Sequence, residues 1–199
     1  MFTLNRPYIS FVVALLLSFL MSAASISAFN SGKKKTEQSP DQKKQMATEH
    51  YNEGVSHMDK AKEKAAMADS NFAFNYRATS DAKAKREYEK AVDEFTEALT
   101  YQPDMVAAHN NLGYCYRKLG RLDESLKQYR TALSLDSTYE RAREYLGETY
   151  LALDSLNLAT AQHTWLVNHK SIFADTLAKS IELYRLKDVS EKMKKPDKM

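Results

Sequence analysis

The five histidines and the single cysteine are the side chains of this 199-residue chain best suited to bind a metal or attack a substrate. The histidines are His50, His57, His109, His163 and His169. No two of them have the i, i+4 spacing around a glutamate that zinc proteases place on one helix. His50 and His57 are separated by two helical turns, too far for one zinc ion. Spacing along the chain therefore indicates no metal site.

Cys115 has no second cysteine to pair with, so an internal disulfide and a four-cysteine metal site are both excluded. We expect it to be a small buried side chain, with a reactive thiol as the alternative. The chain has no G-x-S-x-G motif, and its five glycines form no phosphate-binding loop. We therefore predict no enzyme and no cofactor, and an enzyme of unrecognised type is a distant alternative.

Residues 84–166 repeat themselves with a period of 34 residues. The recurring positions are Leu112-Gly113 and Leu146-Gly147, the small residues Ala91, Ser125 and Ala159, and the ring residues Phe95, Tyr129 and His163. This combination resembles the tetratricopeptide repeat (TPR), whose period is also 34. The copy from Val106 to Tyr139 agrees nearly throughout, although His109 stands where the family usually has tryptophan.

The resemblance implies an all-α solenoid of helical hairpins, with about three repeats and a C-terminal capping helix. Small residues in its columns let the paired helices approach closely. The expected helices are 46–66 and 79–101 for the first repeat, 142–153 and 156–167 for the third, and about 172–193 at the end.

The first repeat departs from this pattern in its length and in two columns. Glu53 and His57 stand where the later repeats have leucine and tyrosine, and an insertion at about 67–82 carries Phe72, Phe74 and Tyr76. We expect the extra residues to lengthen both helices. The aromatic tip either caps the end of the solenoid or forms a partner-binding hairpin.

The N-terminus has the features of an export signal: Arg6, an apolar run at 11–20 and small residues up to Ala28. We therefore predict a signal peptide at 1–28, a flexible basic linker at 29–45, a TPR domain at 46–186 and a basic tail at 187–199. This places the folded part outside the cytoplasm, in a bacterial periplasm. The alternative is an uncleaved membrane anchor, and only then is a membrane a partner.

The net charge of +3 gathers in the linker and the tail, so nucleic acid is not a predicted partner. In TPR proteins the first helix of each repeat lines a groove that binds protein or peptide. The resemblance places the groove at Tyr51, Asn52, Val55, Met58, Asp59, Asn110, Asn111, Tyr114, Arg117, Lys118, Arg141, Glu144, Tyr145, Glu148 and Leu151. Its cations partly match the carboxylate clamp of TPR co-chaperones, from which Glu144 and Glu148 depart. The predicted function is an adaptor or scaffold in the assembly of a cell-envelope complex. The oligomeric state is not indicated.

Overall fold

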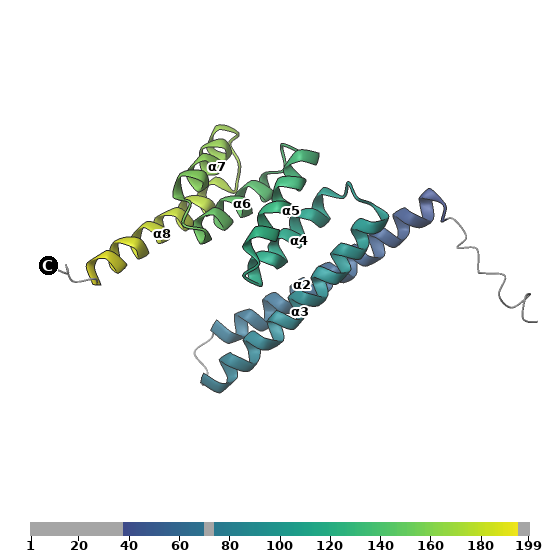
Figure 1. Ribbon diagram of the computed structural model, residues 1–199, viewed down its shortest axis with the longest axis horizontal. Coiled ribbons are helices and arrows are strands. Elements are labelled where there is room, and N and C mark those ends of the chain that lie inside the picture. The colour runs from purple at the N-terminus through teal and green to yellow at the C-terminus, as the bar shows by residue number, and fades with distance from the viewer. Residues whose placement is uncertain (1–37, 70–73, 195–199) are drawn as a thin grey trace, which may run out of the picture. The chain divides into compact units, whose positions relative to one another are not determined.

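The computed structural model describes residues 38–69 and 74–194, and their regular structure is entirely α-helical (Figure 1). The helices are α2 (Pro40–Asp69), α3 (Phe74–Tyr101), α4 (Val106–Lys118), α5 (Leu122–Leu135), α6 (Glu140–Ala152), α7 (Leu156–Asn168) and α8 (Ala174–Lys194). This confirms the predicted all-α class. The helices α2 and α3 have 30 and 28 residues, whereas α4 to α7 have 13 or 14. These bounds fit the expectation that the extra residues of the first repeat lengthen both of its helices.

Successive helices pair as antiparallel hairpins, α2 with α3, α4 with α5 and α6 with α7. The first helices of the hairpins also contact one another, α2 with α4 and α4 with α6. The last helix, α8, contacts both α6 and α7, so it takes the place of the first helix of a fourth hairpin. The first helices therefore form one continuous face, and that face holds the candidate site.

In each of the first two hairpins, a close contact between a glycine and an aromatic ring joins the two helices. A Cβ atom on Gly54 would lie 2.7 Å from the Phe95 ring, and one on Gly113 would lie 2.8 Å from the Tyr129 ring. Both rings are fully buried, so neither has room to move aside. The glycine column and the aromatic column are thus two sides of one contact.

The third hairpin uses a different partner for its glycine. A Cβ atom on Gly147 would lie 2.5 Å from the Leu177 side chain, which belongs to α8 and not to the hairpin's own second helix. His163, the last member of the ring column, is only half-buried. The close approach predicted at Gly147 therefore exists, but α8 makes it.

Buried side chains gather in two clusters along the hairpins. The first joins α2, α3 and α4 through Met58, Tyr88, Phe95, Leu112 and Cys115. The second joins α5 to α8 and includes Tyr129, Leu146, Leu166, Leu177 and Ile181. Cys115 is fully buried, as expected for a structural cysteine.

Two predicted boundaries are corrected by the helices. The linker predicted at 29–45 ends earlier, because α2 begins at Pro40. Proline suits the first position of a helix, and Asp41 in the first turn favours the positive end of the helix dipole. The basic tail predicted at 187–199 is helical as far as Lys194, since residues 187–194 contain no proline or glycine to stop α8.

The predicted leader at 1–28 lies outside the described residues. So does Phe72, and the side chains of Phe74 and Tyr76 are not described either. Within residues 38–69 and 74–194, no helix has the length and apolar character needed to cross a membrane.

Candidate functional site

A pocket of about 720 Å³ opens on the face formed by the first helices. Residues of α2, α4 and α6 contribute most of its lining, and the loop before α6 and the turn before α8 contribute the rest. Its lining residues are Met58, Lys62, Asn110, Asn111, Tyr114, Asp136, Thr138, Tyr139, Glu140, Arg141, Tyr145 and Phe173.

Asn110, Asn111, Tyr114 and Arg141, from the predicted groove, all line this pocket. Tyr51 stands beside them, because its hydroxyl accepts a hydrogen bond of 3.2 Å from Asn111 Nδ2. That bond joins α2 to α4 at one end of the pocket. The repeat alignment therefore brings together side chains from three separate hairpins.

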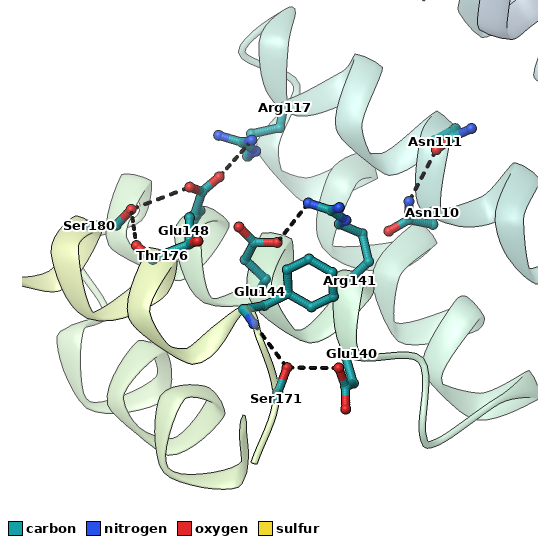
Figure 2. A network of polar contacts seen from close by, with 11 residues as sticks. Asn110, Asn111, Arg117, Glu140, Arg141, Glu144, Glu148, Ser171, Thr176 and Ser180 are labelled. Atoms are coloured by element: carbon teal, nitrogen blue, oxygen red, sulfur yellow. Dashed lines mark hydrogen bonds and ion pairs between the residues drawn. The ribbon is translucent and has the colours of Figure 1, made fainter. Parts of the chain in front are cut away.

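Asn110 offers a buried acceptor in the wall of the pocket. Its side chain is 2% exposed, and its Nδ2 donates to Asn111 Oδ1 over 3.1 Å (Figure 2). Its own Oδ1 is buried and has no hydrogen-bond partner among the described residues. An unpaired buried acceptor costs about 1–3 kcal/mol, so a donor on a bound ligand would relieve that cost.

Two tyrosines form an aromatic surface in the middle of the pocket. The rings of Tyr114 and Tyr145 have their centroids 5.2 Å apart. Burial raises the pKa of both hydroxyls above the usual value of 10, so both stay neutral at physiological pH. The ammonium groups of Lys62 and Lys118 lie 5.4 and 5.6 Å from the centre of the Tyr114 ring. The surface thus combines aromatic rings with cations that lie over the face of the Tyr114 ring.

Arg141 is an exposed cation of the pocket, with the same exposed side-chain fraction as Lys62. Its side chain is 44% exposed, and its guanidinium lies 4.0 Å from the centre of the Phe173 ring and 5.6 Å from that of Tyr145. A single ion-pair contact of 3.3 Å joins it to Glu144. Glu144 is buried, and burial raises the pKa of its carboxyl. The Arg141 guanidinium therefore contacts two aromatic rings and still has N–H groups that can donate to the carboxylate of a ligand.

Arg117 and Glu148, which were predicted as groove residues, bind each other instead. Arg117 Nη2 lies 2.7 Å from Glu148 Oε2, and Ser180 Oγ donates to Glu148 Oε1 over 3.3 Å (Figure 2). Burial by itself would lower the pKa of Arg117, but the Glu148 carboxylate together with Tyr129 and Tyr114 outweighs it, and the pKa is raised. This network joins α4, α6 and α8. We therefore assign both residues to holding the hairpins together, not to the pocket.

Asn52 and Lys118 are not among the residues that line the pocket, and Asn52 is exposed. Six lining residues went unpredicted: Lys62, Asp136, Thr138, Tyr139, Glu140 and Phe173. Lys62 lies one turn beyond Met58 on α2, so a longer helical stripe would have found it. Tyr139 and Phe173 precede α6 and α8, and a mapping restricted to the first helices does not reach them.

Trp165 lies on α7. It packs against the second buried cluster, which includes Leu177 and Ile181 of α8. Its ring also stacks on His169 with centroids 3.6 Å apart, and the Arg143 guanidinium lies 3.8 Å from its centre. The stacking contacts join α6 to the end of α7, on residues outside the pocket lining.

Stacked helical hairpins with a pocket on their first-helix face define a helical-repeat solenoid. Residues 76–140 match the family model described as tetratricopeptide repeat. Residues 76–140 therefore have the sequence pattern of tetratricopeptide repeats, as the 34-residue period predicted.

Two curated plant proteins share sequence with the chain. Hsp70-Hsp90 organizing protein 1 of Glycine max is 28% identical over 75 residues, which is 38% of this chain and 13% of that protein. Hsp70-Hsp90 organizing protein 3 of Arabidopsis thaliana is 35% identical over 57 residues, 29% of this chain and 10% of that protein. The chain thus spans only about a tenth of the length of these relatives.

Solved structures with a similar backbone are TPR proteins as well. The Arabidopsis OM64 TPR domain is 17% identical, with a TM-score of 0.45 over 64% of this chain and 98% of its own. The TPR2B domain of yeast Sti1, solved as a pHsp70 complex, is 18% identical with a TM-score of 0.42 over the same shares. A thermophilic TPR protein of Thermus thermophilus is 18% identical with a TM-score of 0.46, over 84% of this chain and 94% of its own.

Proposed function

We propose that this chain is an exported adaptor or scaffold whose pocket holds a peptide segment of a protein partner. The observation that carries the proposal is the composition of the pocket wall. It presents a buried acceptor without a partner on Asn110, the rings of Tyr114 and Tyr145, and the exposed guanidinium of Arg141. A peptide supplies backbone N–H donors, apolar side chains and acids together, whereas a small metabolite seldom supplies all three.

The charges around the pocket suit a segment with an isolated acid better than a polyacidic one. Arg117 is matched by Glu148, and Arg141 is partly matched by Glu144. The carboxylate clamp of TPR co-chaperones is thus incomplete here, because neighbouring glutamates neutralise part of the positive charge that would bind an acid. We infer that the partner places apolar side chains on the tyrosines and one carboxylate at Arg141. The names of the two plant relatives refer to protein partners, which supports a protein ligand.

The export signal predicted at 1–28 places this adaptor in the bacterial periplasm, within the assembly of a cell-envelope complex. The alternative is a scaffold anchored by the same segment. N-terminal sequencing of the chain recovered from its native host separates the two. A new terminus after Ala24 or Ala28 supports export with cleavage, and an intact Met1 in the membrane fraction supports the anchor.

Site-specific cross-linking tests the peptide pocket. A photoreactive phenylalanine analogue is placed at Thr138, an exposed residue of the pocket lining, so that Arg141 stays intact. In a matched variant it is placed at Glu97, an exposed position on α3 outside the pocket lining. Irradiation in the native host should join an envelope protein to the first variant and not to the second. Cross-linking from both positions alike, or from neither, would contradict a pocket-specific partner.

A further inference from the structure

The three hairpins share a polar pair at the position where the TPR family usually has tryptophan. In each repeat, the residue four positions before the recurring glycine has a guanidinium or imidazole side chain. This side chain forms a hydrogen bond with the residue that directly precedes the ring column. The pairs are His50 with Glu94 at 2.8 Å, His109 with Gln128 at 2.7 Å, and Arg143 with Gln162 at 3.3 Å. The pair is thus a repeated structural contact between the two helices of a hairpin.

The first repeat changes this pair by adding two carboxylates. Glu94 replaces the glutamine of the later repeats. Glu53 stands in the column where Leu112 and Leu146 are buried, and it is exposed on α2 one turn after His50. One ligand atom from each of His50, Glu53 and Glu94 lies within 4.8 Å of the other two. Among the described residues, no other three histidine, cysteine or acidic side chains form such a group.

We propose that His50, Glu53 and Glu94 form a binding site for a divalent transition-metal ion of the zinc class. One imidazole and two carboxylates are ligands of the kind that zinc takes from proteins, with water in the fourth position. Magnesium and calcium prefer oxygen-only ligands, so the imidazole favours a transition metal over them. The site lies on the α2–α3 hairpin and does not include any residue of the peptide pocket.

The geometry needs only small side-chain movements to accept the ion. Zinc bonds of about 2.0–2.1 Å in a tetrahedron place neighbouring ligand atoms roughly 3.3 Å apart. The 2.8 Å contact between His50 Nδ1 and Glu94 Oε2 therefore opens slightly, and Glu53 moves inward. Tyr101 stacks on the His50 ring, with centroids 5.8 Å apart and an angle of 5° between the planes. That stacking restricts the ring, and both His50 and Glu94 remain 27% exposed, so an ion has access.

Metal binding by the untagged full-length chain is the experiment, with zinc chloride as the probe in titration calorimetry. The wild type should bind one zinc ion per chain. Glu94→Gln introduces the residue of the later repeats and keeps the hydrogen bond to His50, and Glu53→Gln keeps the shape of its side chain. Each should weaken zinc affinity at least about tenfold, since loss of even an outer-shell partner costs 10- to 100-fold.

The matched control is His109→Gln, which removes the equivalent histidine of the second repeat and should leave zinc binding unchanged. Circular dichroism shows that the variants fold, and the absorption spectrum of bound Co²⁺ reports the ligand geometry without relying on a variant. The proposal is overturned if the wild type binds no zinc, if the two glutamine variants bind as tightly as the wild type, or if magnesium competes on equal terms. Loss of binding in His109→Gln would equally place the ion elsewhere.

Discussion

The Glu148 carboxylate on α6 lies 2.7 Å from the Arg117 guanidinium on α4, and both side chains are largely removed from solvent. This contact joins the second hairpin to the third, and Ser180 extends it to the last helix. Polar side chains on the first helices therefore contribute to how the hairpins stack.

Replacing Arg117 with alanine should lower the free energy of unfolding by about 2–4 kcal/mol, because the Glu148 carboxylate then loses its partner while still mostly buried. Urea denaturation of Arg117→Ala, Glu148→Ala and the double variant measures the loss and the coupling energy. Additive effects of the two single changes would show that the pair does not stabilise the stacking.

Replacing Arg141 with alanine should instead weaken partner binding by about 1–3 kcal/mol while the melting temperature changes little. The guanidinium is an exposed cation of the pocket, and its contacts with Phe173 and Tyr145 are those of a surface group. Affinity for the cross-linked partner and a thermal melt are the two measurements. An unchanged affinity would remove Arg141 from the binding surface.

Replacing Gly113 with leucine should destabilise the protein by about 1–3 kcal/mol or more through overpacking, because an added Cβ meets the buried Tyr129 ring at 2.8 Å. Gly120 offers the matched control. An added Cβ meets nothing there within 4 Å, and asparagine tolerates its φ of +76°. Thermal melts of Gly113→Leu and Gly120→Asn should therefore differ clearly, and equal melts would remove the close-packing role of the glycine column.

The Cys115 thiol should resist modification in the folded protein. Burial raises the pKa of this thiol to about 12, so almost no reactive thiolate exists at pH 8, and the sulfur is also inaccessible. A chromogenic disulfide reagent should react slowly with the native chain and quickly in urea. Fast labelling without denaturant would restore the reactive-thiol interpretation.

Acid should destabilise the first hairpin through Glu87. Lys64 Nζ and His57 Nδ1 each lie 2.7 Å from its carboxylate, and these bonds lower its pKa from 4.5 to about 2. The folded state thus binds the proton more weakly than the unfolded state. The resulting stability, up to about 3 kcal/mol, is present above pH 4.5 and is lost as the pH falls toward 2.

Urea melts of wild type and Glu87→Gln at several pH values between about 5 and 2 measure this contribution. The variant cannot lose a carboxylate, so its stability should fall less steeply over that window. Parallel pH dependence in the two proteins would show that Glu87 contributes nothing specific.

Much of the fold was predictable because the residues that recur in a repeated sequence indicate which face of each helix packs against its neighbours. The recurrence of Gly113 as Gly147 and of Phe95 as Tyr129 indicates which side chains face a neighbouring helix, and the 34-residue period sets the hairpin length. The groove positions of the TPR family, aligned on these columns, predicted Asn110, Asn111, Tyr114 and Arg141, which line one pocket.

The spacing of residues within one helix does not indicate which side chains of other helices they contact. Those contacts were decided only by the tertiary structure. Glu94 reaches His50 across a hairpin with extra length, Leu177 fills the space over Gly147 in place of a residue from α7, and Glu148 neutralises Arg117. Along the chain, His50 had no second histidine within reach and indicated no metal site. The approach of α3 to α2 supplies the carboxylate that the sequence spacing does not reveal, because side chains distant in sequence meet only when the helices pack.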